Sequence, residues 1–286
     1  MRVLIVGVTG MFGHAALQVL TANPRLEVWG TLRAPGARRA FHDGVQPRLI
    51  DSVDVLDERA MVTVLDRVRP DVVINAVGVI KQLATANDPT IVLPINALFP
   101  HRLAGLCGLV GARLVHISTD CVFSGRVGHY TEADTSDAED LYGKSKFIGE
   151  LHDASHAITL RTSGIGHELG SAHGLLEWFL AQQRTAKGFG QAVYSGLPWV
   201  ELARVIGDVV IPRPELHGLF HVSSMPITKL ELLRLIAAAY EKDITIVPDE
   251  SVRIDRSLDS TRFKAATGYV APGWPELVAR MHDSRR

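Results

Sequence analysis

Two residues in the middle of the chain have the types and the spacing of a proton-transfer pair. Tyr142 and Lys146 stand four positions apart, and on a helix this spacing puts both side chains on one face. A neighbouring ammonium favours the phenolate and is expected to lower the pKa of the tyrosine. Tyr142 could then give its proton to a carbonyl oxygen as a hydride arrives at the carbon. Taken alone, the same spacing also fits an ordinary exposed helix face.

Two hydroxyl residues stand at the end of a predicted strand upstream of this pair. Ser118 and Thr119 directly follow the strand pattern Arg113–Ile117, and the carboxyl ends of parallel strands are where sites assemble. Thr119 is expected to hydrogen-bond a substrate oxygen and to stabilise the negative charge that develops there. A Ser-Thr pair at a strand end is also common turn chemistry. We interpret His116, inside the strand, as a packed core histidine.

A glycine-rich loop joins the first strand pattern, Val3–Val6, to the first helix pattern, Phe12–Leu20. Glycine permits a tight turn and lets a ligand approach the backbone closely, and the N–H groups at a helix start attract a pyrophosphate. The spacing is Gly-x-x-Gly-x-x-Gly rather than Gly-x-Gly-x-x-Gly, and a turn without a ligand is the alternative. The loop predicts a dinucleotide site made of Gly7, Thr9, Gly10, Met11, Phe12 and Gly13.

The end of the second strand pattern indicates which dinucleotide is bound. Proteins that bind NAD usually place a carboxylate there for the ribose 2′-hydroxyl, whereas this strand ends in Thr-Leu-Arg33. Arg33 can pair with a 2′-phosphate, and Arg38 and Arg39 follow, so NADPH is favoured over NADH. A solvated loop with three arginines is the alternative. After the third strand, Asp54, with Val55 beside it, is expected to accept a hydrogen bond from the adenine amino group.

Strand and helix patterns alternate through the first half of the chain. Strands are predicted at Val3–Val6, Leu26–Leu32, Arg48–Ile50, Asp71–Ile74, Arg113–Ile117 and Ala157–Leu160. Helices are predicted at Phe12–Leu20, Asp57–Val68, Ile91–Val110 and Glu139–Leu151. The alternation predicts an α/β fold with a doubly wound parallel sheet of Rossmann type, which binds ligands at the carboxyl ends of its strands.

The rhythm of the sequence changes after about Ser163. Helices are predicted at Leu175–Gln183, Val200–Val209 and Lys229–Tyr240, with loops at Gly188–Pro198 and Pro212–Gly218. We therefore predict a dinucleotide-binding domain over residues 1–163. A smaller α/β substrate lobe is predicted over residues 164–286, with part of it packing back on the first domain.

The composition fits a globular protein and excludes several classes. The chain has 286 residues, of which 47% are hydrophobic and 21% charged. A formal net charge of −1 provides no global positive field for nucleic acid or anionic lipid. The two cysteines, Cys107 and Cys121, and the lack of a signal-peptide or membrane-span pattern predict a soluble, cytoplasmic protein. No spacing of histidine, cysteine and carboxylate residues predicts a metal site.

Taken together, these residues resemble the extended short-chain dehydrogenase/reductase family, and most of all its dTDP-4-dehydrorhamnose reductase branch. The matching segments are Gly7–Gly13, Asn75–Gly78, Ile95–Ala97, Ser118–Gly125, Tyr142–Lys146 with Gly149-Glu150, and Leu160–Ser163. The resemblance implies that Thr119, Tyr142 and Lys146 are catalytic. It also implies that the cofactor contacts Ala76, Val77, Gly78 and Ser163. Tyr142 and Lys146 are expected to contact the cofactor as well, with Lys146 reaching the nicotinamide ribose.

Position 121 separates the reactions of this family. The related 4,6-dehydratases resemble Thr-Asp-Glu there, because eliminating water needs an acid–base carboxylate pair, whereas this chain has Cys121. The resemblance therefore implies NADPH-dependent reduction of the 4-keto group of a nucleotide-linked, 6-deoxy sugar. The rhamnose reductases typically have Tyr in place of Cys121 and Trp in place of Gly164, which indicates a different or bulkier sugar here.

Four residues are expected to contact this substrate: Asp120, Cys121, Gly164 and Arg256. Arg256 lies in Asp255–Ser260, which resembles a late motif of the family's substrate lobe. It would meet the nucleotide diphosphate there, and a surface arginine in a helix-capping turn is the alternative.

Two other functions stay open at this stage. One is a non-catalytic NADP-binding subunit that serves a partner enzyme, and the other is an epimerase that forms a transient ketone and retains its cofactor. Retention of Thr119, Tyr142 and Lys146 argues against the first, since a binding module does not need a proton donor. The expected partner is a nucleotide sugar, not nucleic acid or a membrane, and a homodimer is one arrangement that the resemblance allows.

Overall fold

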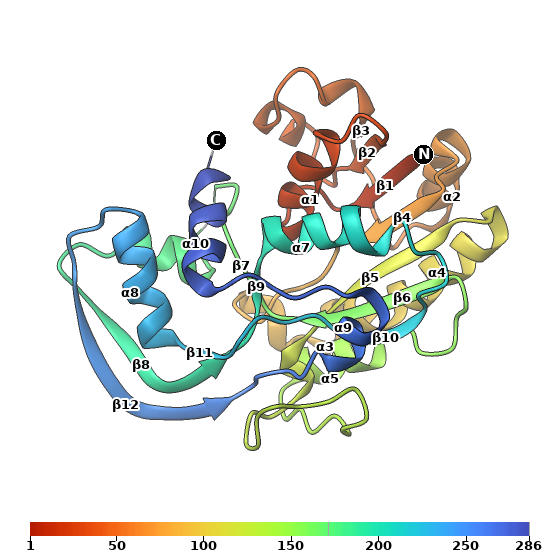
Figure 1. Cartoon of the computed structure of the whole chain (residues 1–286). Helices are drawn as coiled ribbons and strands as arrows, with labels where there is room; N and C mark the ends of the chain where they lie inside the picture. Colours follow the sequence, from red (N-terminus) through yellow and green to blue (C-terminus); the bar gives the residue numbers. More distant parts are fainter. Residues whose placement is uncertain (171, 286) are drawn as a thin grey trace.

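A seven-stranded parallel sheet lies at the centre of the computed structural model, which describes residues 1–170 and 172–285 (Figure 1). Across the sheet the strand order is β10-β6-β5-β4-β1-β2-β3. In chain order its strands are β1 (Arg2–Val6), β2 (Glu27–Thr31), β3 (Leu49–Ile50), β4 (Val72–Asn75), β5 (Arg113–Thr119), β6 (Ala157–Thr162) and β10 (Gly218–His221). The chain changes direction across the sheet between β1 and β4, and ligands of such sheets bind at that point. The predicted fold class is confirmed.

Burial on both faces of the sheet explains why the central strands form. The side chains of Val3, Leu4, Ile5 and Val6 in β1 are all fully buried, as is usual for a parallel strand covered on both faces. Val3 and Ile5 belong to one hydrophobic cluster, and Leu4 and Val6 to the other. This division follows the two-residue period of a strand.

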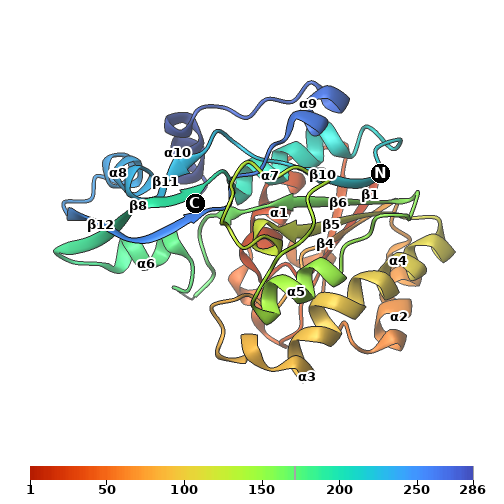
Figure 2. The ribbon, with the colours of Figure 1, turned by 90° about the horizontal axis from the view of Figure 1, so that it is seen from below.

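Helices cover both faces of the sheet. Helix α1 packs with α7 on one face, and α2, α4 and α5 lie along the other (Figures 1 and 2). The helices are α1 (Met11–Thr21), α2 (Glu58–Val68), α3 (Pro89–Val92), α4 (Phe99–Val110), α5 (Leu141–Ile148), α6 (Leu175–Ala181), α7 (Trp199–Val205), α8 (Lys229–Ala239), α9 (Thr261–Thr267) and α10 (Trp274–Asp283).

The helix predicted over residues 91–110 is present but irregular. Between α3 and α4 the segment Leu93–Leu98 is a π-helix, and Pro94 has no N–H to continue a regular helical ladder. The whole stretch Pro89–Val110 is the one helix of the described residues that is long and apolar enough to cross a membrane. Its most apolar window is 44% buried in the fold, and core helices of globular proteins pass the same test of length and composition.

The second half of the chain adds two small sheets. In one, β8 (Thr185–Tyr194) lies between β11 (Ile227–Thr228) and β12 (Thr245–Asp255). In the other, β7 (Gly164–Ile165) pairs in parallel with β9 (Leu197–Pro198). The β8 and β12 strands curve away from the main sheet and form the outer edge of the molecule (Figure 1).

The prediction of a loop over Gly188–Pro198 is wrong, because most of this stretch belongs to β8 and β9. Its glycines are sites of close approach rather than turns. A Cβ atom on Gly188 would lie 2.6 Å from the Leu230 side chain, and one on Gly190 would lie 2.1 Å from that of Glu250. The unpredicted strand β12 is mostly exposed or half-buried, so no apolar period marks it in the sequence.

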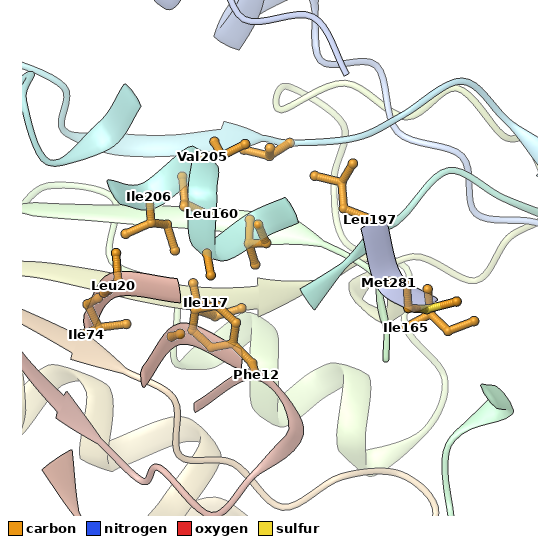
Figure 3. Packing of buried hydrophobic residues seen from close by; sticks show 14 of the residues in the cluster. Phe12, Leu20, Ile74, Ile117, Leu160, Ile165, Leu197, Val205, Ile206 and Met281 are labelled. Carbon is orange, nitrogen blue, oxygen red and sulfur yellow. The ribbon is translucent and has the colours of Figure 1, made fainter. Parts of the chain in front are cut away.

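One hydrophobic core joins the two halves of the chain. Figure 3 shows Phe12 and Leu20 of α1 close to Ile206 and Val205, with Leu197 and Met281 in the same cluster. Strand β10 extends the main sheet by pairing with β6. Segments from beyond residue 163 therefore complete both the core and the sheet, and the boundary at 163/164 stays a prediction.

Candidate active site

The glycine loop between β1 and α1 is shaped by close backbone contacts. Gly7 has a φ of +92°, in the left-handed region that favours glycine. A Cβ atom on Gly13 would lie 2.1 Å from the carbonyl oxygen of Gly7, so any side chain there would force the turn open. These two positions explain why the sequence needs glycine at the first and the third place of the motif.

The start of α1 is suited to an anion. Gly10 occupies the N-cap position and has no side chain that could satisfy the first helical N–H groups. A Cβ atom on Gly10 would find its nearest neighbour 3.8 Å away, so the space above the loop is open. The first turn, Met11–His14, contains no acidic residue. These features fit a dinucleotide pyrophosphate, held by backbone N–H groups and the helix dipole.

The residues predicted to bind the adenosine end of the cofactor differ in whether their side chains already have partners in the structure. Arg33 follows β2, is exposed, and makes no ion pair with any residue that the structure describes. Arg38 is already engaged, because its guanidinium lies 2.6 Å from the Asp51 carboxylate and donates to the Leu49 carbonyl. Asp54 is exposed and accepts a hydrogen bond from the Leu56 N–H with one oxygen, which leaves the other oxygen for a ligand.

Thr119, Tyr142 and Lys146 meet in one cleft. Its lining also includes the glycine-loop residues Gly10 to Phe12 and the segment after β4 that contains Ala76, Val77 and Gly78. Thr119 ends β5, its hydroxyl donates to the Asp120 carboxylate at 3.2 Å, and it lies near enough to the Tyr142 phenol to affect the pKa of that group. The Lys146 ammonium donates to the Ile117 carbonyl at 2.7 Å. Sequence reasoning predicted each of these residues, and the fold brings them together with the dinucleotide loop.

Buried polar contacts hold α5, which carries Tyr142 and Lys146, in place. Asp140 caps α5 by accepting from the Gly143 N–H at 2.7 Å. The buried Asn96 side chain accepts from the Val79 N–H at 2.8 Å and donates to the Ser145 hydroxyl at 3.2 Å. A glycine is required at Gly149, where a Cβ atom would lie 2.0 Å from the Asn96 carbonyl oxygen. These contacts fix α5 against the loop that lines the cofactor side of the cleft.

A buried ion pair lies behind the catalytic residues. Two guanidinium nitrogens of Arg161 each lie 2.7 Å from a different carboxylate oxygen of Glu150. Ser118 donates to Glu150 at 2.5 Å, and Arg161 also contacts the His221 ring at 3.3 Å. The pair connects the end of α5 with β5, β6 and β10, so it fixes the strand end that carries Thr119. His116 is fully buried beside Asn75, as expected of a core histidine.

Burial, rather than the charge of Lys146, controls the pKa of Tyr142. Loss of solvation raises this pKa well above its ordinary value, the Cys121 and Asp120 side chains raise it further, and the Thr119 hydrogen bond opposes them. The prediction that Lys146 lowers the pKa of the phenol therefore fails in this structure, where its ammonium is directed at the Ile117 carbonyl. Burial also lowers the pKa of Lys146 to about 8, against an opposing effect of Glu150.

A second cavity adjoins the cleft and shares part of its lining. Asp120, Cys121, Ser163 and Gly164 line both cavities, and Arg256 lines the second. Arg256 donates to the Phe123 carbonyl at 2.8 Å, and its guanidinium lies 3.8 Å from the Cys121 sulfur. The fold thus brings the predicted substrate residues of the two halves of the chain to one place.

Burial strongly shifts the pKa values of titratable side chains around this cavity. Burial raises the pKa of Asp120, and the nearby Arg256 is the largest influence that opposes the rise. Burial raises the pKa of the Cys121 thiol to about 12. The thiol is therefore protonated at neutral pH, which is inconsistent with a nucleophilic role because the thiolate is the reactive form.

Three residues of the site were missed from the sequence. Lys229 is the first residue of α8, lines the second cavity, and lies within electrostatic range of Asp120 and Cys121. Tyr194, which lines the same cavity, fell within a predicted loop, and Trp199 of the first cavity lay just outside a predicted helix. The one available signal was weak: a lysine in the first turn of a helix opposes the helix dipole.

The fold and the cleft define a Rossmann-type protein of the extended short-chain dehydrogenase/reductase class. The sequence model of the family described as RmlD substrate binding domain matches residues 1–285. The chain belongs to this family.

Named relatives of the chain include enzymes and an enzyme subunit. The dTDP-4-dehydrorhamnose reductase of Aggregatibacter actinomycetemcomitans is 25% identical over 234 residues, which cover 79% of this chain and 74% of the relative. The methionine adenosyltransferase 2 subunit beta of Mus musculus is 31% identical over 149 residues. That match covers 52% of this chain and 41% of the mouse protein, so the chain spans less than half the length of this second relative.

Solved structures share the whole fold. A dTDP-4-dehydrorhamnose reductase from Bacillus anthracis, in complex with NADP, superposes with a TM-score of 0.80 at 22% identity and covers 100% of this chain and 99% of that one. A dTDP-glucose 4,6-dehydratase from the same organism, in complex with NAD, gives 0.77 at 15% identity, with 99% and 96% covered. At these identities the likeness shows the fold.

Proposed function

We propose that the protein is an NADPH-dependent reductase of the 4-keto group of a nucleotide-linked, 6-deoxy sugar. The observation that carries the proposal is the meeting of Thr119, Tyr142 and Lys146 in one cleft with the dinucleotide loop. The membership of the family and the dTDP-4-dehydrorhamnose reductase among the relatives support the sugar-nucleotide substrate.

The chain's own residues would hold the cofactor along one wall of the cleft. When bound there, NADPH supplies the hydride that reduces the ketone carbon. The N–H groups of the Gly7–Gly13 loop would donate hydrogen bonds to the pyrophosphate, and Arg33 would bind the 2′-phosphate. Asp54 and Val55 would contact the adenine, and Ala76, Val77, Gly78 and Ser163 would line the nicotinamide side.

Tyr142 would supply the proton that balances the hydride. Because burial keeps its phenol protonated at neutral pH, it is a hydrogen-bond donor to the ketone oxygen before the reaction. As negative charge develops on that oxygen, the proton passes from Tyr142 to it. Thr119 would donate a hydrogen bond to the same oxygen. The Lys146 ammonium, which donates to the Ile117 carbonyl in this structure, would turn toward the phenolate that remains and stabilise it.

The substrate side supports reduction rather than elimination of water. The Cys121 thiol has its pKa raised to about 12, so it cannot replace the carboxylate that dehydration needs. Arg256 and Lys229 are two cations beside Asp120 and Cys121. We propose that Arg256 binds the diphosphate of the nucleotide, with Asp120, Cys121 and Gly164 on the sugar side.

The test is turnover of NADPH with a panel of nucleotide-linked 4-keto-6-deoxyhexoses, followed through the absorbance of the reduced nicotinamide. At least one member should be reduced, and Tyr142→Phe should abolish most of that turnover while NADPH still binds. No turnover with any member by the wild type would reject the proposal.

A second candidate, a non-catalytic NADP-binding subunit, is favoured by the 31% identity with the methionine adenosyltransferase subunit. It predicts tight NADPH binding without turnover on any panel member. An epimerase would convert a sugar nucleotide without net consumption of NADPH. The same assay, with product analysis, therefore separates the three functions.

The cellular location and the oligomeric state of the protein are also proposals. A cytoplasmic location agrees with the two free cysteines, Cys107 and Cys121, and fractionation of cells that express the tagged protein would test it. Homodimer formation is testable by light scattering of the purified protein.

A further inference from the structure

The indole of Trp199 occupies the space beside Gly164. A Cβ atom on Gly164 would lie 2.0 to 2.2 Å from three atoms of the Trp199 ring. The two residues are brought together by the parallel pairing of β7 and β9, in which Gly164 lies opposite Leu197. A side chain at position 164 is therefore excluded by the indole, although the two residues are far apart in the sequence.

The indole is held in this place by packing. Its ring centroid lies 5.5 Å from that of Phe12 in the first turn of α1, and its Cδ1 atom would be 3.1 Å from a Cβ atom on Gly166. Its buried Nε1 has no hydrogen-bond partner among residues 1–170 and 172–285. A phenyl ring could therefore replace the indole without the loss of a hydrogen bond.

Trp199 separates two cavities. On one side it lines the catalytic cleft, of about 240 Å³, together with Tyr142 and Lys146. On the other side it lines a cavity of about 520 Å³ between α1, α6 and α10. Met11 and Trp199 are shared by the linings of both cavities, so the indole is part of the partition that keeps the cleft small.

We propose that Trp199 is a specificity-determining residue, whose ring forms the aromatic wall against which the sugar packs and which limits the size of the sugar's substituents. This inference rests on the proposed function. Pockets for small ligands use aromatic walls with a few polar groups to fix orientation, and here Thr119, Asp120 and Tyr142 supply the polar groups. The aromatic wall comes from α7, in the second half of the chain.

The test compares Trp199→Ala and Trp199→Phe on the panel member that the wild type reduces fastest. Trp199→Ala is expected to raise KM for the sugar nucleotide roughly 10-fold or more, the scale at which pocket truncation changes discrimination. Trp199→Phe should stay within about threefold of the wild type, and the Kd for NADPH should change by less than about twofold in both. Trp178→Ala, at a residue 38% exposed on α6, is the matched control and should leave all constants unchanged.

A second measurement addresses the partition itself. Trp199→Ala joins the cleft to the neighbouring cavity, so its activity on panel members with bulky sugar substituents should rise relative to its activity on the small one. Gly164→Ala forces the indole to move, because its Cβ atom would lie 2.0 Å from the ring, so this ratio should change in that variant as well. Thermal unfolding of each variant checks that the fold is kept.

The outcomes distinguish this inference from the proposed function. An active wild type with an unchanged KM and an unchanged size preference in Trp199→Ala would overturn the role of Trp199 alone. An equal loss of NADPH and sugar-nucleotide binding would also overturn it, since the indole would then support the cofactor side. A wild type that reduces no panel member would reject the proposed function, and the inference with it.

Discussion

The two walls of the catalytic cleft are built from different distances along the chain. The cofactor wall uses short continuous runs at or just after strand ends, namely Gly10–Phe12 and Asn75–Gly78. The substrate wall gathers Cys121, Lys229 and Arg256 from the end of β5, the start of α8 and the turn after β12. The difference indicates that short local motifs can specify the reaction, whereas the choice of sugar depends on contacts between distant parts of the chain.

The strongest test of this comparison removes Tyr142, the proposed proton donor, which lines the cleft between the two walls. In Tyr142→Phe the ketone oxygen loses its acid, and kcat should fall about 10²- to 10⁴-fold. The Kd for NADPH should hardly change, because the loop of the cofactor wall is intact. Lys144→Ala, exposed on the same helix, is the control. A variant with more than a tenth of the wild-type kcat would mean that another group gives the proton.

The next largest effect is expected on the substrate wall. Arg256→Ala removes the cation proposed for the diphosphate, and hydrogen bonds to charged groups contribute about 1.5–3 kcal/mol, so kcat/KM should fall roughly 10- to 100-fold. The loss should appear mainly in KM. Arg253→Ala, exposed on β12, should behave as the wild type. If both variants lose activity equally, general charge rather than a specific contact steers the substrate.

The pH dependence probes Lys146, which lies between the walls. Burial lowers its pKa to about 8, so its ammonium loses its proton as the pH rises through that value, and kcat/KM should fall about tenfold per pH unit above it. Glu150 and His116 are the nearby titratable groups: Glu150 raises the pKa of Lys146, and burial lowers the pKa of His116 well below its ordinary value. His116 is therefore neutral in this range.

The same lowering of the Lys146 pKa has the opposite effect on the stability of the fold, which should rise with pH. Between pH 8 and the ordinary lysine pKa of about 10.4 the unfolded chain binds more protons at this site, so its contribution to the free energy of unfolding increases with pH. Lys146→Arg keeps the charge and should remove the fall in activity above pH 8. Identical pH profiles for the two proteins would assign the fall to another group.

The smallest effect is expected at the adenosine end of the cofactor wall. Arg33 is exposed, so its pair with a 2′-phosphate would be partly screened by solvent. Arg33→Ala should raise the Kd for NADPH about five- to tenfold and leave that for NADH within about twofold. Arg25→Ala, at an exposed arginine before the other end of β2, is the matched control. Equal losses for the two cofactors would remove Arg33 as the residue that distinguishes them.

Much of the fold was readable because its signals are local. Buried parallel strands such as β1 and β4 are short apolar runs, and the glycines at 7 and 13 are required by contacts within a few residues. By contrast, β12 is largely exposed and carries no apolar period. The glycines at 188 and 190 resemble turn residues in the sequence, and only the neighbouring chain shows why they occur in a strand.

The residues of the site also differ in whether the sequence alone could predict them. Thr119, Tyr142 and Lys146 could be predicted because a strand end and one helix face bring them together. The pKa of Tyr142 could not, since it depends on burial and on Asp120 and Cys121. Trp199 and Lys229 could not be assigned either, because their relation to the cleft exists only after β7 pairs with β9 and α8 packs beside β8.

The position of β10 bears on how far the molecule can be shortened. This strand, from the second half of the chain, covers the outer side of β6, whose six residues Ala157–Thr162 are all buried. A fragment that stops near residue 163 would leave β6 as an edge strand with unpaired N–H and C=O groups, and such edges recruit other chains into aggregates. The nucleotide-binding half is therefore expected to precipitate when produced alone, however complete its binding loop.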